Sequence, residues 1–96
     1  MSLDVFVRFD AKPGQLERLR RELVTIIEPT RAEPGCLEFH LYEEKNASGT
    51  LCVHSCWKDD AAIDKHLQLP HMKRFLAVLD DLVTNEVKAV RTQEIV

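Results

Sequence analysis

The sequence predicts an α+β fold in which helices cover one face of a four-stranded antiparallel sheet. Four segments alternate apolar and polar residues with the period of two that is typical of strands, and the segments between them repeat apolar residues at helical spacing. Their order is strand, helix, two strands, two helices, strand. With 96 residues, 45% of them hydrophobic and 30% charged, the chain has globular composition. We expect one domain spanning residues 1–96.

The first half of the chain predicts a strand, a helix and a second strand. Residues 3–10 alternate, so we expect a strand with one buried face. Residues 15–28 place leucines and isoleucines on one helical face, and we expect Pro29 to end or kink this helix. Residues 36–44 alternate again. On this strand we expect Leu37, Phe39 and Leu41 on the core face, and Cys36, Glu38, His40 and Tyr42 on the other.

A hairpin follows. A loop at residues 45–49, rich in turn formers, leads into a returning strand at residues 50–57. If the hairpin is centred near Ala47, His40 lies opposite His54. On the returning strand we expect Leu51, Val53, Ser55 and Trp57 on one face, and Cys52, His54 and Cys56 on the other.

Two helices and a strand complete the pattern. Asp59 or Asp60 is expected to cap a short helix that stops before Pro70. A further helix carries an apolar stripe, and residues 86–96 predict the last strand. The residues of the stripe are Met72, Phe75, Leu76, Leu79, Leu82 and Val83.

This βαββαβ order is that of a ferredoxin-like domain, which leaves one sheet face without helices. A second copy of the chain, packed sheet on sheet, would cover that face, so we expect a homodimer. The expected residues of the face are Phe6, Arg8, Glu38, His40, Tyr42, Cys52, His54 and Cys56.

Short motifs in a fixed order add a family resemblance. "EPGCLEF" follows the first helix, Trp57 ends the hairpin, and "AAIDKHLQLPHMKRF" covers the helix pair. This ordered set, which spans nearly the whole chain, resembles the antibiotic biosynthesis monooxygenase (ABM) family. The matching residues are Glu33, Pro34, Gly35, Cys36, Trp57, Ala62, His66, Pro70, His71 and Phe75.

The resemblance implies a dimeric α/β barrel with a pocket between sheet and helices in each subunit. Family members include monooxygenases that oxidise quinols or polycyclic phenols without metal or flavin, haem-degrading enzymes and an isomerase. Ser55 stands where the family commonly has a glutamate, and Phe39 where it often has a tyrosine. The haem-degrading branch fits poorly, because His66 and Leu76 replace its tryptophan and its haem-ligating histidine.

His66 and His71 are the candidate catalytic bases. An imidazole titrates near neutral pH and could take the proton of a bound phenol. The resulting anion is electron-rich enough to give an electron to dioxygen, so the cavity would need no cofactor. Either histidine could instead be structural, His66 by bonding a strand and His71 by starting a helix. The expected walls for a small aromatic substrate are Phe39, Ser55, Trp57, Met72 and Phe75.

A second cluster lies on the other sheet face. Cys52, His54 and Cys56 occupy alternate positions of one strand, so they share a face with His40. Thiolates and imidazoles suit Zn²⁺, but strand residues two apart are separated by about 6.5–7 Å. We expect a half-polar dimer interface with paired imidazoles rather than a metal site. The three cysteines, in a chain with no export pattern, are expected to be reduced.

Charge and hydropathy narrow the function classes. A net charge of −3 gives no reason to expect nucleic acid as the partner. No apolar run approaches a bilayer span, so we expect a cytoplasmic protein without membrane association. Three functions remain: a cofactor-independent oxygenase, an isomerase or detoxification enzyme using the same histidines, and a binding module whose cavity is filled by side chains.

Overall fold

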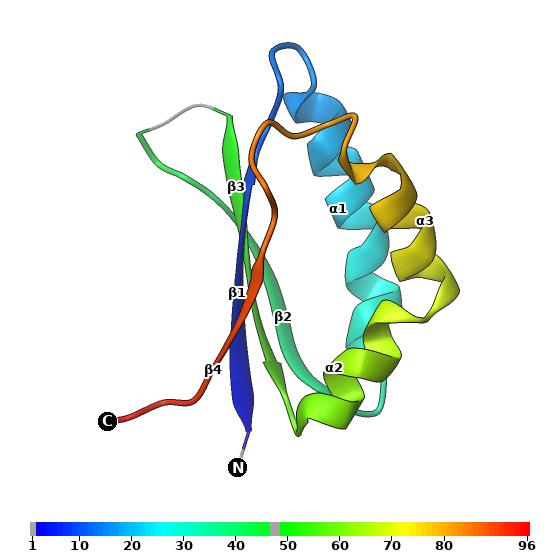
Figure 1. Ribbon diagram of the computed structural model, residues 1–96, viewed down its shortest axis with the longest axis vertical. Coiled ribbons are helices and arrows are strands. Elements are labelled where there is room, and N and C mark those ends of the chain that lie inside the picture. The colour runs from blue at the N-terminus through cyan, green and yellow to red at the C-terminus, as the bar shows by residue number, and fades with distance from the viewer. Residues whose placement is uncertain (1, 47–48) are drawn as a thin grey trace.

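The computed structural model describes residues 2–46 and 49–96 (Figure 1). Within this part of the chain, strands and helices follow one another in the predicted order, which confirms the ferredoxin-like α+β class. The elements are β1 (Leu3–Asp10), α1 (Leu16–Arg31), β2 (Cys36–Glu43), β3 (Thr50–Trp57), α2 (Asp60–Leu67), α3 (Pro70–Leu79) and β4 (Ala89–Thr92).

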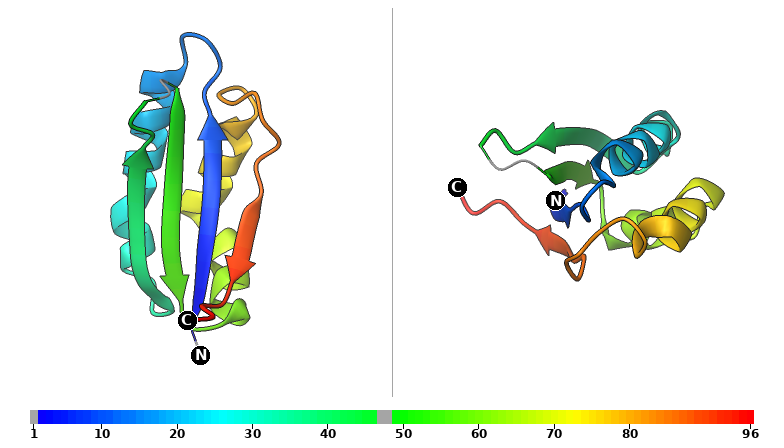
Figure 2. Two further views of the ribbon diagram at one scale, coloured as in Figure 1. Left: turned by 90° about the vertical axis from the view of Figure 1, so that its left-hand side faces the viewer. Right: turned by 90° about the horizontal axis from the view of Figure 1, so that it is seen from above.

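The sheet has the strand order β2-β3-β1-β4, and every neighbouring pair is antiparallel. All three helices lie on one side of it (Figure 1). Figure 2, on the left, shows the opposite face with no helix of the described residues in front of it. The two faces therefore have different surroundings, as the sequence pattern predicted.

The start of β2 departs from strict alternation. Cys36 pairs with Trp57 and Glu38 with Cys56, so Leu37 is an extra residue, a β-bulge. Leu37 is 55% exposed instead of facing the core, and Cys36 packs against the core instead of lying on the open face. The prediction was wrong for these two side chains, because a one-residue bulge reverses the alternation on one side of it.

Helix α1 runs through Pro29 to Arg31 instead of ending at Glu28. Proline has no N–H for the carbonyl one turn back, but in the last turn few hydrogen bonds remain to be lost. Tertiary contacts hold this turn: Thr30 is buried, and Arg31 donates through Nε and Nη2 to the carbonyl of Phe39 at 3.0 and 2.8 Å. Packing therefore overrides the local effect of the proline.

Helix α3 is shorter than its predicted stripe. It ends at Leu79, and the chain leaves it through tight turns. Leu82, fully buried, and Val83, bridged to Ala11, still face the core from beyond the helix, whereas Leu76 is 45% exposed. The stripe is confirmed as buried helix at Met72, Phe75 and Leu79.

The hairpin has the expected register, since His40 pairs with His54. Its predicted centre at Ala47, with Ser48, lies outside the described residues.

The hydrophobic core lies between the sheet and the helices. Each helix presents one apolar side to it, and none of the helices within residues 2–46 and 49–96 is long and apolar enough to cross a membrane. The largest side chains that are almost wholly buried there are Leu19, Leu23, Leu51, Trp57 and Leu82.

The turn before β2 touches helix α2 at Gly35. A Cβ at this position would overlap the Cβ of Ala62, so the turn accepts no side chain. The N–H of Lys58 donates to the carbonyl of Gly35 at 3.0 Å, and Asp59 caps α2 by accepting the N–H of Ala62 at 2.8 Å. These contacts hold α2, and with it His66, against the end of the sheet.

We expect Gly35→Ala to lower the free energy of unfolding by about 1–3 kcal/mol, because the added methyl overpacks this contact. Urea denaturation of the variant and the wild type measures the change. Ala62→Gly removes the methyl group that the new one would overlap. Gly35→Ala should therefore lower the free energy of unfolding less in the Ala62→Gly background than in the wild type. An unchanged urea midpoint for Gly35→Ala would contradict the close contact.

Candidate active site

A cavity of about 250 Å³ lies between the sheet and the helices. All four strands and all three helices of the described residues contribute to its wall, which is mainly apolar. Side chains leave this cavity unfilled, whereas the binding-module alternative requires a cavity that side chains fill. The predicted site residues that line it are Phe39, Ser55, Trp57, His66, Met72 and Phe75.

Trp57 forms the wall next to His66. Its indole N–H donates to the hydroxyl of Ser55 at 2.9 Å, two residues back on the same face of β3. The indole is 2% exposed, and a buried N–H of this kind requires an acceptor. The ring centroid lies 4.6 Å from that of His66. Ser55 therefore satisfies the tryptophan, which in turn packs against the histidine.

The carboxylate of Glu33 joins the two histidines. Its Oε2 lies 2.8 Å from Nδ1 of His66 and 3.0 Å from Nε2 of His71. The side chains are 8% exposed for Glu33, 7% for His66 and 14% for His71. They come from the turn after α1, from α2 and from the start of α3, so one carboxylate connects three segments. His71 is not among the described residues that line the cavity.

Burial lowers the pKa of His66 below its ordinary value of 6.5, because the charged ring would lose its hydration. The hydrogen bond and charge of Glu33 act in the opposite direction without outweighing the burial. His66 is therefore neutral at pH 7. The nitrogen facing the carboxylate, Nδ1, then carries the proton, which leaves Nε2 with the free lone pair. Such a ring can accept a proton from a bound molecule.

Glu33, His66 and His71 also offer one potential metal-ligating atom each, all within 4.8 Å of one another. Two imidazoles and a carboxylate are a known donor set for Zn²⁺. Ligand atoms about 2.1 Å from a tetrahedral ion lie about 3.4 Å apart, farther than the 2.8 and 3.0 Å found here. The three groups lie at hydrogen-bonding distances, and an ion would have to push the carboxylate away from both rings.

Cys36 lies near this cluster but is not a nucleophile. Burial, reinforced by the negative charge of Glu33, raises the pKa of its thiol to about 11. The thiol is therefore protonated at neutral pH, and only the thiolate is strongly nucleophilic. All three cysteines are free, as predicted.

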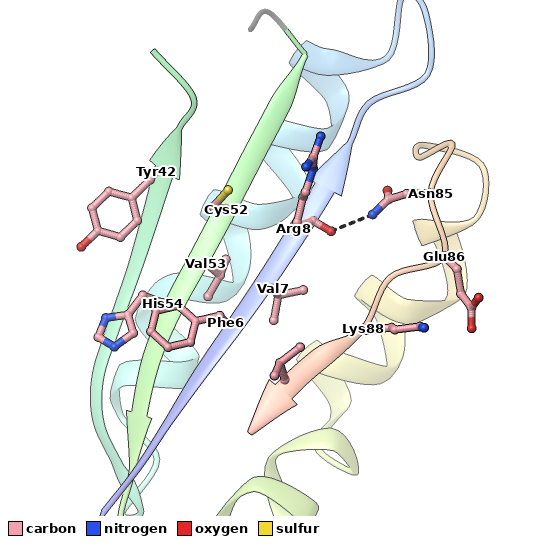
Figure 3. A pocket seen from close by; sticks show the side chains of 11 residues that line it. Phe6, Val7, Arg8, Tyr42, Cys52, Val53, His54, Asn85, Glu86 and Lys88 are labelled. Atoms are coloured by element: carbon pink, nitrogen blue, oxygen red, sulfur yellow. Dashed lines mark hydrogen bonds between the residues drawn. The ribbon is translucent and has the colours of Figure 1, made fainter. Parts of the chain in front are cut away.

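A groove of about 750 Å³ crosses the uncovered face of the sheet (Figure 3). Figure 3 shows Phe6 and His54 side by side, with Tyr42 and Cys52 farther along the same face. The rings of Phe6 and His54 stack with centroids 5.0 Å apart, and those of His40 and His54 lie 6.3 Å apart with planes 14° from parallel. The imidazole pair expected at this face is present.

The zinc alternative for this face is not supported. Nε2 of His54 lies 2.8 Å from Oδ1 of Asp4, and Nε2 of His40 lies 3.1 Å from Oε1 of Glu38. Both imidazoles therefore contact carboxylates on their own face. Among the described residues, the cysteines and histidines of this face do not bring three ligand atoms close enough to share one ion.

Two charged residues near the cavity, Glu33 and Arg91, were not predicted as part of a site. Glu33 was noted only within the turn motif, whose place next to a histidine-bearing helix pair was the available signal. Arg91 lines the cavity because it pairs with Val5, whose side chain faces the helices. That register is visible only in the assembled sheet.

Comparison with known protein families assigns the chain to one of them. Residues 3–78 match the family described as "Antibiotic biosynthesis monooxygenase", a span from β1 into α3 that includes every predicted site residue. The chain belongs to the antibiotic biosynthesis monooxygenase family, as its motifs indicated.

Individual relatives are similar in sequence and structure. The chain is 35% identical over 83 residues to "Putative monooxygenase Rv0793" of Mycobacterium tuberculosis, covering 86% of this chain and 81% of that protein. The solved structure of Rv0793 matches with a TM-score of 0.93 at 30% identity, covering 99% of this chain and 96% of that one. PA3566 of Pseudomonas aeruginosa matches with a TM-score of 0.93 at 33% identity, covering 99% and 95%.

A Synechocystis protein, "Uncharacterized protein sll1783", is 32% identical over 85 residues. The match covers 86% of this chain but 58% of that protein, so the chain spans little more than half of this relative.

We expect the free energy of unfolding to fall as the pH drops below 6.5, the ordinary pKa of histidine. The folded pKa of His66 is lower than the unfolded one, so the unfolded state binds more protons in this range and acid favours it. Urea midpoints at several pH values measure the slope, which should be shallower in His66→Gln. Titration of the His66 ring by NMR gives the pKa directly, and Glu33→Gln should lower it further. A His66 pKa at or above 6.5 would contradict the lowering of this pKa by burial.

Proposed function

We propose that this protein is a monooxygenase that oxidises a small aromatic quinol or phenol with dioxygen, without a metal or flavin. One observation carries the proposal: a neutral histidine, hydrogen-bonded to a buried carboxylate, stands on the wall of an unfilled apolar cavity. Membership of the antibiotic biosynthesis monooxygenase family and the name of the Mycobacterium tuberculosis relative support it.

His66 is the base in this proposal. A phenol bound in the cavity gives its proton to Nε2, and the imidazolium that forms is stabilised by the carboxylate of Glu33 at Nδ1. The same carboxylate contacts His71, which acts as a positioning residue. Glu33 thus favours the charged ring that exists only after proton transfer, while burial keeps the resting ring neutral.

The substrate supplies the electrons. The phenolate transfers one electron to dioxygen, which gives a phenoxyl radical and superoxide, and these combine at a ring carbon that carries a hydrogen. The imidazolium of His66 returns its proton to the resulting peroxide anion, and loss of water with the ring hydrogen then leaves a quinone carbonyl. One oxygen atom enters the product and the other leaves as water, so no other reductant is needed. The apolar wall keeps water from the radical pair.

The cavity limits the size of the substrate. Its volume of about 250 Å³ lies below the roughly 300–1,000 Å³ typical of sites for drug-sized ligands. Trp57, Phe39 and Phe75 offer ring faces and edges for stacking. A compound of one or two fused rings suits these dimensions.

We also propose that the protein acts as a homodimer joined through the uncovered sheet face. Phe6, Tyr42 and Val90 on this face are each about half exposed, at 50%, 52% and 53%. An apolar patch spread over three strands is costly in water. A second copy of the same sheet matches it in extent and in its mixture of rings and histidines.

Chelator-treated protein should consume oxygen above the autoxidation blank with at least one member of a panel of one- and two-ring quinols and phenols. His66→Ala should lower this rate by about 10²- to 10⁴-fold, the usual contribution of a general base. His71→Ala should have the smaller effect, because His71 is hydrogen-bonded to Glu33 and does not line the cavity. An oxygen electrode measures the rates.

Arg20→Met is the control, because Arg20 binds carboxylates of α1 and β2 and does not line the cavity. Equal rates in His66→Ala and the wild type would refute His66 as the base. Proton exchange or isomerisation of a small carbonyl compound without oxygen uptake would favour the isomerase alternative.

Phe6→Glu should convert the dimer to monomer, because it places a charge at the centre of the uncovered face. Sedimentation equilibrium measures the mass. Val24→Glu is the matched control, since Val24 is 53% exposed on α1, away from that face. A wild-type monomer at all concentrations, or a Phe6→Glu dimer, would contradict this assembly.

A further inference from the structure

The cavity reaches solvent where β4 faces helices α2 and α3. Most of its wall residues are buried, but Leu76 on α3 and Ala89 and Arg91 on β4 are exposed. Strand β4 is an edge strand of the sheet (Figure 2). Arg91 is charged and lies in this exposed part of the wall, so a molecule that enters the cavity here passes it.

Arg91 occupies a position where the alternation of β4 calls for an apolar side chain. It pairs with the buried Val5, so it points toward the helices rather than toward the open face. Its Nη1 lies 2.8 Å from Oδ1 of Asp60, and its Nη2 lies 2.7 Å from Oδ1 of Asp64. The two aspartates are four residues apart and share one side of α2. The guanidinium thus spans the mouth from the sheet to the helix.

The charges of this cluster do not cancel. One guanidinium and two carboxylates leave a net charge of −1 at the entrance, and the carboxylate of Glu33 lies farther on, against His66. An anion that approaches the mouth is repelled, whereas a neutral molecule is not. For the chemistry of His66 this sign is useful, because only a phenol that arrives protonated has a proton to give.

We propose that Arg91, held by Asp60 and Asp64, is the gate of the cavity, and that these three residues together select neutral over anionic aromatic ligands. Arg91 closes the mouth while it is bound to α2 and opens it when the two ion pairs break. The inference rests on the proposed function in one respect, that the cavity receives the substrate.

The exposure of the cluster suits a gate. The side chain of Arg91 is 33% exposed, and those of Asp60 and Asp64 are 68% and 67% exposed. The side chains of Glu33, His66 and His71 are nearly buried by comparison. Exposed ion pairs are weak because water and salt screen them, so they break and re-form readily. A buried pair at this position would keep the cavity shut.

Trp57 is the chain's single tryptophan and lies in the cavity wall, so its fluorescence reports access to the interior. Acrylamide serves as the neutral quencher and iodide as the anionic one, with ionic strength held constant by exchanging iodide for chloride. In Arg91→Met the acrylamide quenching constant should rise about two- to tenfold, the range that corresponds to losing two exposed ion pairs. Iodide quenching should rise less, because the mouth becomes more negative.

The double variant Asp60→Asn/Asp64→Asn tests selection by charge. It also opens the gate, but it changes the charge of the cluster from −1 to +1, so iodide quenching should rise more than acrylamide quenching. Arg20→Met is the matched control, since Arg20 also binds two carboxylates, is 32% exposed and does not line the cavity. Its quenching constants should equal those of the wild type.

Unchanged acrylamide quenching in Arg91→Met, or an equal rise in Arg20→Met, would overturn the gate. Equal changes for iodide and acrylamide in the aspartate double variant would overturn the selection by charge. These readings do not depend on turnover. If quenching changes as expected while no phenol or quinol supports oxygen uptake, the proposed function fails and the gate stands.

Discussion

The carboxylate of Glu33 is the group on which the site depends. It accepts hydrogen bonds from imidazoles on two different helices while its side chain is almost removed from water. A buried charge is tolerated only where hydrogen bonds replace its hydration, so both histidines must stay in place. The carboxylate therefore sets the distance between α2 and α3 and the tautomer of His66 together. The same two hydrogen bonds thus fix both the packing of the helices and the tautomer of the candidate base.

The two faces of the sheet carry two different candidate sites, the cavity on the helix side and the groove on the open side. Along β1, Val5 points into the cavity and Phe6 into the groove on the opposite face. The period of two in a strand puts the side chains of neighbouring residues on opposite faces; Val7 and Val53 nevertheless line both the cavity and the groove. A substitution at one position of a strand thus bears on the cavity and the next one on the open face. The separation allows the proposed ligand binding and the proposed self-association to be tested independently.

The ionic groups around the cavity differ in strength according to their burial. Glu33 and the two histidines lie where water is excluded, so their hydrogen bonds are costly to break. Arg91 and its aspartates lie in solvent, where the same kind of contact is weak. Inside the cavity the geometry is held firmly, and at its mouth it is not. This gradient is what an enclosed site needs if molecules are to enter and leave.

The sequence by itself determined the class of fold, the order of its elements and six residues of the cavity wall, because alternation and helical spacing report directly which side chains face the core. It could not place Leu37, since a bulge depends on how β2 pairs with β3, nor the end of α1, since contacts with Phe39 hold the turn that Pro29 weakens. Glu33 and Arg91 were decided only by tertiary structure. Each acts through partners more than 20 residues away in the chain, and local periodicity carries no information about such contacts.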